Sequence, residues 1–283
     1  MLLLNRKVRT VLIDIAIHLL LIAAAAYMVL PFFWMLSTSL KPQNEIFAHP
    51  PIWISPNFNL SAYQELIDRR HILSIVGNTF IVAAGATVLR LFFCSLGGYG
   101  FAKYQFPGRE TMFGVLLATM IIPFTITMIP LYLIMLRLNW IDTFWPLVIP
   151  GAASAFGIFF MRQYISSVSD ELIDAARIDG ASEFGIYWRV ILPIIAPGLV
   201  SLGLIFFMGS WNDYVFPLII LKSPGNLTLP LAIRSMIGGI IGRPVYHLQM
   251  AASVISIIPL LVIFLLFQRR FVAGIQAGAL TGE

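Results

Sequence analysis

Cysteines, histidines and enzyme motifs are scarce or missing in this chain, and each absence removes a class of protein. The single cysteine, Cys94, leaves no partner for a disulfide framework. The four histidines are dispersed, and no Cys/His spacing suited to a metal is present. The patterns G-x-x-x-x-G-K-[ST], H-E-x-x-H and G-x-S-x-G are absent too. We therefore expect no catalytic residues, no metal site and no cofactor bound by this chain.

Charged residues are also scarce, and their scarcity indicates a membrane protein. Charged residues make up 11% of the 283 residues and hydrophobic residues 59%, far from the composition of a soluble domain. Crossing about 30 Å of hydrocarbon takes about 20 apolar residues. Six segments are long enough, namely 11–36, 73–96, 111–136, 144–164, 197–221 and 249–267. The sequence predicts an all-α integral membrane protein with six transmembrane helices.

The distribution of Lys and Arg predicts how these helices are oriented. One set of flanks carries Arg6, Lys7, Arg9, Lys103, Arg109, Arg162, Arg177, Arg189, Arg269 and Arg270, and the other carries Lys41, Arg69, Arg70, Arg137, Lys222, Arg234 and Arg243. Because positive charge is enriched on the cytoplasmic side, the first set faces the cytoplasm. The domains are then a cytoplasmic N-terminus (1–10), a membrane domain (11–267) and a cytoplasmic tail (268–283). The first segment is too long for a signal peptide and is interpreted as an uncleaved helix.

One cytoplasmic loop, residues 165–196, contains a charged and glycine-broken segment, DAARIDGASEFGIYWRVILP at 174–193. Ser169 or Ser167 can cap a first helix, Gly180 can end it in a left-handed turn, and Ser182 can cap a second. In the second helix, apolar residues at helical spacing predict a single apolar face, and Pro193 closes the run. These residues are Phe184, Tyr187, Trp188 and Ile191. The segment is predicted to be helix, turn, helix.

The same segment resembles the cytoplasmic coupling loop of permease subunits of ABC importers. The resemblance rests on Asp174, Ala175, Ala176, Gly180, Val190, Leu192 and Pro193. The family usually has Glu in place of Asp174 and Ile in place of Val190. The resemblance implies that ATPase subunits dock on Asp174, Ala175, Ala176, Asp179, Gly180, Phe184, Trp188 and Pro193. The alternative is an amphipathic hairpin lying on the membrane surface.

Flanking motifs narrow the resemblance to carbohydrate-uptake permeases of the maltose type. They are YGFAKYQFPGRE at 99–110, SWNDYVFPL at 210–218, LTLPLAI at 227–233 and QRRFVAGIQAGALTG at 268–282. The resemblance implies a type I importer permease fold with a cytoplasmic coupling helix pair. It also implies a heterodimer with a related permease, two ATP-binding subunits that carry ATP and magnesium, and an extracytoplasmic sugar-binding protein. The location would be a prokaryotic inner membrane, amid lipid and without nucleic acid.

Polar residues within apolar segments are candidates for the substrate pathway, because they are costly in a membrane. Aromatic faces beside amides or carboxylates suit a sugar ring, which presents both C–H faces and hydroxyls. The candidates are Asn78, Thr79, Trp211, Asn212, Asp213 and Tyr214. Two further ionisable residues, Asp14 and Arg90, have similar predicted depth and could instead pair with each other. In this family most sugar contacts can also fall on the sister permease.

Other functions remain open from the residues alone. Glycerol-phosphate and polyol importers share these motifs. An ion-coupled secondary transporter could use kinked helices, and Pro123 with Pro130 predicts a kink in the third segment. Against a secondary transporter stand the large cytoplasmic helix pair and the lack of a convincing internal repeat.

Overall fold

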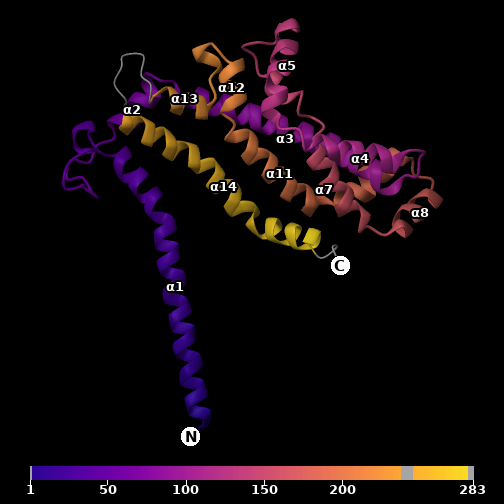
Figure 1. Cartoon of the computed structure of the whole chain (residues 1–283), viewed down its shortest axis with the longest axis horizontal. Coiled ribbons are helices and arrows are strands. Elements are labelled where there is room, and N and C mark those ends of the chain that lie inside the picture. The colour runs from indigo at the N-terminus through magenta and orange to yellow at the C-terminus, as the bar shows by residue number, and fades with distance from the viewer. Residues whose placement is uncertain (1, 237–244, 280–283) are drawn as a thin grey trace. The chain divides into compact units, whose positions relative to one another are not determined.

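The computed structural model describes the backbone of residues 2–236 and 245–279 and the side chains of 8–236 and 245–268 (Figure 1). Regular structure in these residues is entirely helical, which confirms the all-α prediction. The longest helices are α1 (Leu2–Ser39), α3 (Ile72–Lys103) and α14 (Tyr246–Ala279). The other α-helices are α2 (Ser61–Asp68), α4 (Arg109–Thr119), α5 (Phe124–Arg137), α6 (Trp145–Val148), α7 (Ala155–Ser166), α8 (Asp170–Ile178), α9 (Glu183–Ile186), α10 (Leu192–Ile194), α11 (Ala196–Trp211), α12 (Val215–Ile220) and α13 (Leu229–Ser235). Three short segments, η1 (Gln43–Glu45), η2 (Tyr187–Ile191) and η3 (Pro224–Asn226), join them.

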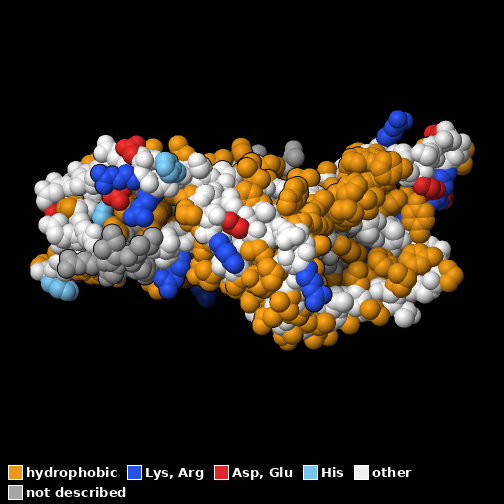
Figure 2. Space-filling model, turned by 90° about the horizontal axis from the view of Figure 1, so that it is seen from above, with side chains coloured by type: hydrophobic (Ala, Val, Ile, Leu, Met, Phe, Trp, Pro, Cys, Tyr) orange, Lys and Arg blue, Asp and Glu red, His pale blue; other side chains and the backbone are white. Residues whose placement is uncertain are grey.

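Much of the molecular surface is apolar, as expected of a protein whose solvent is lipid. Figure 2 shows hydrophobic side chains covering broad areas of one face. Three described helices are long and apolar enough to span a membrane, over Val8–Ser39, Ile72–Lys103 and Tyr246–Gln268. Two bent helix pairs raise this number to five if each pair is one span. The count of six transmembrane helices therefore stays a prediction.

The third predicted segment, 111–136, is broken rather than kinked. Helix α4 ends at Thr119, α5 begins at Phe124, and the two axes differ by 94°. Pro123 lies at the break in an extended conformation, just before the first turn of α5. No hydrogen bond within the helix requires an N–H at that position, so the lack of one in proline costs nothing. Pro130 lies inside α5. The prolines thus mark the segment correctly, but the bend is concentrated at Pro123.

The chain divides into two compact units, Met1–His71 with Ile233–Ile257 and Ile72–Ala232 with Ile258–Glu283. In the first unit, the chain after α1 folds back on the end of that helix. Lys41 is buried, its Nζ donates to the carbonyl of Ile52, and it lies 4.3 Å from the centroid of the Trp34 ring. The hydroxyls of Ser39 and Tyr63 are hydrogen-bonded at 2.7 Å.

In the second unit, α3 packs against both α7 and α11 (Figure 1). Glycines permit the close approach of α3 and α7. A Cβ on Gly98 would lie 2.6 Å from the Cβ of Met161, and one on Gly157 would lie 2.6 Å from the Sγ of Cys94. Neither position has room for a methyl group. The sequence alone gave no sign that these glycines serve packing.

We expect Gly98→Ala to weaken the α3–α7 contact by about 1 to 3 kcal/mol, the usual cost of overpacking. The matched control is Gly100→Ala in the same helix, where an added Cβ would meet nothing within 4 Å. The check is the melting temperature of the two purified variants in detergent. Equal melting temperatures would contradict the close packing of α3 on α7.

A second set of contacts fixes the loop between α12 and α13. The carboxylate of Asp142 accepts hydrogen bonds from the backbone N–H groups of Lys222 at 2.8 Å and Ser223 at 2.9 Å. The side chain of Asn226 donates to the Asp142 carbonyl at 2.6 Å. The hydrogen bonds from Ser223, first of all, lower the pKa of Asp142. Their stabilising effect is complete above the ordinary aspartate pKa of about 3.9 and is lost as pH falls toward the lowered value.

Candidate coupling surface and polar pocket

The first helix of the predicted pair, α8, begins and ends at signals that the sequence contains. The hydroxyl of Ser169, not that of Ser167, caps α8 and accepts a hydrogen bond from the N–H of Glu171 at 3.3 Å. Asp170 and Glu171 lie in the first turn, where the helix dipole favours negative charge. Gly180 follows the helix at φ +80°, in the left-handed region. The predicted helix and glycine turn are confirmed.

The second helix begins as predicted but changes character after one turn. The hydroxyl of Ser182 accepts from the N–H of Gly185 at 3.2 Å and caps α9. After α9 the chain enters η2, a π-helical turn over Tyr187–Ile191, and continues into α10. A π-helix bonds residue i to i+5 and appears mostly as a single turn, often at functional sites. The second helix is therefore not a regular α-helix.

The predicted apolar face of this second helix is divided between buried and exposed residues. Tyr187 and Ile191 are buried, but Phe184 is 60% exposed and Trp188 44% exposed. Ile186, outside the predicted face, is fully buried instead. From Tyr187 to Ile191 the π turn departs from the 3.6 residues per turn on which the prediction rests.

The buried side of the pair rests on the ends of α3 and α7. Ile173 of α8, Ile186 of α9 and Tyr187 of η2 share one core cluster with Met161 and Ile165 of α7. The hydroxyl of Tyr187 is hydrogen-bonded to that of Ser95 in α3 at 2.6 Å. Ala176, one of the predicted coupling residues, packs against this cluster. The helix pair is thus fixed to the membrane helices through its own hydrophobic core.

Polar contacts that the sequence did not predict add to this attachment. Lys103 at the end of α3 donates to Asp170 at 2.6 Å, and the hydroxyl of Tyr104 donates to the carboxylate of Glu183. Arg177 donates to Glu183 at 2.8 Å and to Asp174 at 3.1 Å, so it joins α8 to α9. Burial and then the hydrogen bond to Glu183 raise the pKa of Tyr104, which keeps its proton at neutral pH.

The outward side of the pair carries apolar side chains amid charges. Ile178 is 87% exposed at the end of α8, and Phe184 lies across the Gly180 turn. We call Ile178 and Phe184 the coupling knobs. Ile178 was not among the predicted coupling residues, whereas Phe184 was, and the predicted residues Asp174, Ala175, Asp179, Trp188 and Pro193 are exposed as well. Isolated exposed hydrophobics are ordinary, but a cluster rimmed by polar groups marks an interaction site.

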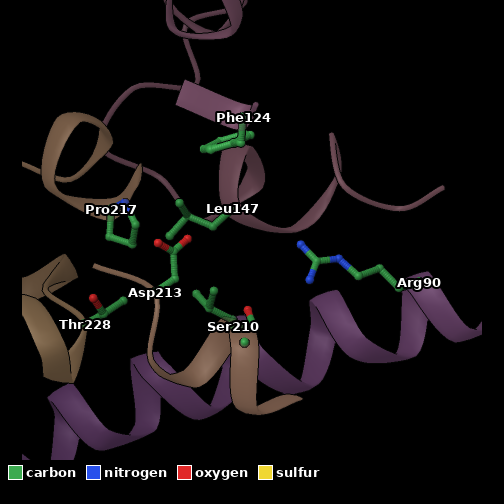
Figure 3. A pocket seen from close by; sticks show the side chains of 9 residues that line it. Arg90, Phe124, Leu147, Ser210, Asp213, Pro217 and Thr228 are labelled. Carbon is green, nitrogen blue, oxygen red and sulfur yellow. The ribbon is translucent and has the colours of Figure 1, made fainter. Parts of the chain in front are cut away.

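A separate pocket of about 220 Å³ lies within the second unit (Figure 3). Its lining combines two charged side chains, two hydroxyls and apolar groups. The lining residues are Val82, Arg90, Phe124, Leu147, Gly209, Ser210, Asp213, Pro217 and Thr228. They come from α3, from α5 just after its bend, from α6, and from the chain around α11, α12 and α13. Polar groups that converge beside apolar side chains in one cavity are typical of a ligand site.

Arg90 and Asp213 face the pocket from different elements. Figure 3 shows the Arg90 guanidinium reaching toward the side of the pocket where the Asp213 carboxylate lies. Arg90 Nε donates to the carbonyl of Gly151 at 3.1 Å, and the guanidinium lies 5.6 Å from the centroid of the Phe206 ring. The Asp213 carboxylate accepts from backbone N–H groups at the start of α12. The two charges are therefore held by separate backbone groups, Arg90 by the Gly151 carbonyl and Asp213 by N–H groups at the start of α12.

Thr228 adds a hydroxyl to the same pocket. Its residue is 3% exposed, and its Oγ1 has no hydrogen-bond partner among the described residues. Leaving a buried hydroxyl unpaired costs free energy, and such groups call for a functional or solvent explanation. The pocket therefore offers a hydroxyl that is ready to bond a ligand or water.

Asn78 and Thr79, two of the predicted pathway residues, do not line this pocket. The Asn78 side chain donates to the carbonyls of Gly225 at 2.8 Å and Leu227 at 3.1 Å. Thr79 Oγ1 accepts from the N–H of Leu229 at 2.7 Å. Both side chains hold the chain between α12 and α13 against α3.

Of the other predicted pathway residues, only Asp213 lines the pocket. Trp211 is fully buried and stacks on Phe207 with centroids 5.5 Å apart. Asn212 donates to the carbonyl of Met208 at 2.8 Å, and Tyr214 packs beside a neighbouring core cluster. The pairing of Asp14 with Arg90 stays a prediction, since the two residues belong to different units.

The pocket also contains residues that sequence reasoning did not assign to the pathway. They include Arg90, Phe124, Ser210 and Thr228. Only Arg90 carried a signal, as a charged residue in an apolar segment.

Comparison with known proteins identifies the family. Residues 95–276 match the family described as binding-protein-dependent transport system inner membrane component. The chain is similar to the arabinooligosaccharides transport system permease protein AraQ of Bacillus subtilis (strain 168), with 32% identity over 276 residues, 95% of this chain and 96% of that protein. It is 33% identical over 198 residues to the sn-glycerol-3-phosphate transport system permease protein UgpE of Yersinia enterocolitica, 70% of each chain.

A solved structure shares the fold. It is a chain of a bacterial ABC transporter involved in the import of the acidic polysaccharide alginate, with TM-score 0.82, 24% identity, and coverage of 92% of this chain and 96% of that one. The family match spans well over half of the sequence and includes the coupling helix pair and the pocket residues that follow it. The chain therefore belongs to the family of binding-protein-dependent transport system inner membrane components, and is a membrane-embedded permease subunit of an ABC importer.

Proposed function

We propose that this chain forms half of the translocation pathway of an ATP-driven sugar importer. Its partners would be a related permease in a heterodimer, two ATP-binding subunits and an extracytoplasmic sugar-binding protein. The observation that carries the proposal is the α8–α9 pair, which is anchored to α3 and α7 on one side and presents the coupling knobs on the other. Such an element can transmit a displacement caused by a soluble partner to the membrane helices.

The side of the membrane follows from charge. Both termini and the 165–196 loop lie on the flank richer in Lys and Arg, so they face the cytoplasm of a prokaryotic cell. ATP and magnesium would bind on the partner subunits, because this sequence lacks a glycine-rich phosphate loop. The chain itself is a non-catalytic subunit. Closure of the ATP-binding pair would push the coupling knobs and switch the bundle between inward-open and outward-open states.

The pocket favours an uncharged, hydroxylated substrate over a phosphate ester. Arg90 and Asp213 contribute opposite formal charges, so a phosphate attracted to the guanidinium would be repelled by the carboxylate. A sugar hydroxyl can accept from one and donate to the other, while the ring of Phe124 offers an apolar face. Similar proteins include one named for arabinooligosaccharide transport and one named for sn-glycerol-3-phosphate transport, so both substrate classes occur among the relatives.

The experiment is uptake into lipid vesicles that contain the complete assembly, with ATP on the coupling side and the binding protein outside. We expect labelled arabinotriose to accumulate only with ATP, and not with an assembly whose ATPase lacks its phosphate-loop lysine. This chain alone in lipid should hydrolyse no ATP. Accumulation driven by a proton gradient without ATP would instead indicate a secondary transporter. Preference for sn-glycerol-3-phosphate would overturn the sugar assignment.

A further inference from the structure

A chain of polar contacts passes through Tyr104, outside the coupling loop itself. On one side, its hydroxyl donates to the Glu183 carboxylate at the start of α9. Arg177 holds the same carboxylate through Nε at 2.8 Å and through a second nitrogen at 3.3 Å, and it also holds Asp174. Tyr104 therefore contacts Glu183, whose ion pair with Arg177 joins the two coupling helices.

On its other side, Tyr104 is linked to the start of α4. Its carbonyl accepts from Arg109 at 3.3 Å, and Arg109 forms an ion pair with Glu110 at 2.8 Å. Arg162 of α7 donates to both oxygens of Glu110, at 3.0 and 3.1 Å. Arg162 also lies 3.8 Å from the centroid of the Phe113 ring in α4. The first turn of α4 is thus fixed to the same polar chain as the coupling helices.

Helix α4 leads directly to the pocket. After the 94° bend the chain continues as α5, whose first residue, Phe124, lines the cavity with Arg90 and Asp213. Phe124 also packs edge-on against Phe216 of α12, with ring centroids 5.4 Å apart. A displacement of the start of α4 would therefore act on one wall of the pocket.

We propose that Tyr104 is the positioning residue through which movement of the coupling helices reaches α4 and the pocket wall. The inference rests on the proposed function, because it presumes that ATPase subunits move α8 and α9. A positioning role differs from docking: Tyr104 would transmit the push without holding the ATPase in place. A single hydrogen bond, from the Tyr104 hydroxyl, links this residue to Glu183, whereas Lys103 holds the start of α8 through two acceptors.

Tyr104→Phe removes the hydroxyl that makes this link and keeps the ring. The Tyr104 ring packs edge-on against Tyr99, with centroids 5.4 Å apart, and phenylalanine keeps that contact. The matched control is Tyr63→Phe, which also loses one phenol hydrogen bond, to Ser39, but in the first unit. Glu183→Gln tests the acceptor, because it keeps an oxygen and loses the charge.

The measurement is the number of arabinotriose molecules imported per ATP hydrolysed by the complete assembly in vesicles. We expect Tyr104→Phe to lower this ratio about fivefold, the lower end of typical coupling between sites. The ATPase subunits should still co-purify, and the melting temperature should match that of Tyr63→Phe. Adding Glu183→Gln to Tyr104→Phe should cause only the loss that comes from the weakened ion pair with Arg177, so the double variant should lose less than the two single effects combined.

Two results would overturn the proposal. An unchanged ratio in Tyr104→Phe would show that the hydroxyl transmits nothing. Loss of the ATPase subunits in that variant would show a docking role instead. Failure of the proposed function is distinguishable, because the unmodified assembly in vesicles would then show no ATP-dependent accumulation of arabinotriose either.

Discussion

Replacing Ile178 by aspartate should detach the ATP-binding subunits from the assembly. Ile178 is 87% exposed at the end of α8, next to the Gly180 turn, and is the most exposed large hydrophobic residue of the helix pair. Burial of an isoleucine contributes about 1.5 to 3 kcal/mol, and a carboxylate buried in its place adds a desolvation cost. We expect the affinity for the ATPase subunits to fall by at least about 100-fold.

The check is co-purification of the ATPase subunits with this chain from solubilised membranes, together with substrate-stimulated ATP hydrolysis. Ile178→Leu keeps the apolar surface and should retain both. Ile54→Asp is the matched control for a new exposed charge, since Ile54 is 78% exposed in the first unit, outside the coupling loop. Wild-type levels of ATPase subunits in Ile178→Asp would favour the surface-lying hairpin over a coupling device.

Asp213→Asn should reduce sugar uptake about 10- to 100-fold while the assembly stays intact, since hydrogen bonds to charged groups contribute about 1.5 to 3 kcal/mol. Asparagine keeps the size of the side chain and one oxygen for the N–H groups at the start of α12. The measurements on one preparation are arabinotriose uptake, ATP hydrolysis stimulated by the binding protein, and melting temperature. Asn212→Ala is the control, because that neighbour bonds back to the Met208 carbonyl and does not line the pocket.

The opposite charge provides a second test of the pocket. Arg90→Gln alone leaves the Asp213 carboxylate without its balancing charge, so uptake of a neutral sugar should fall. The double variant with Asp213→Asn restores neutrality and should recover part of that loss. If Asp213→Asn lowered the melting temperature and left uptake unchanged, the role of Asp213 would be to hold α12 in place. The sugar contacts would then belong to the sister permease.

The coupling helices show how far sequence reasoning reached. Their boundaries depend on local interactions, because a serine hydroxyl caps the helix that it precedes and a glycine allows the left-handed turn. These features were predicted from residues at fixed spacing. The π turn was not predicted from the sequence. The second helix packs against α7, and the residues that become buried there depend on contacts between residues far apart in the chain.

The polar contacts of the site lay beyond sequence reasoning for a different reason. Tyr104 and Glu183 are 79 positions apart, and Asn78 and Leu227 are 149 apart. No periodicity relates such residues, so an isolated sequence cannot show that they meet. Asn78 and Thr79 therefore looked like pathway residues, although their side chains hold the chain before α13.

The sequence by itself determined that the protein lies in a membrane, that it is helical, and that residues 174–193 form a capped helix pair. Composition and local capping decide those properties, and both can be read along the chain. Only the tertiary structure decided where α4 and α5 separate, which side chains surround the pocket, and that Tyr104 joins the coupling helices to α4. Those outcomes depend on long-range packing, in which side chains far apart in sequence compete for the same space and the same hydrogen-bond partners.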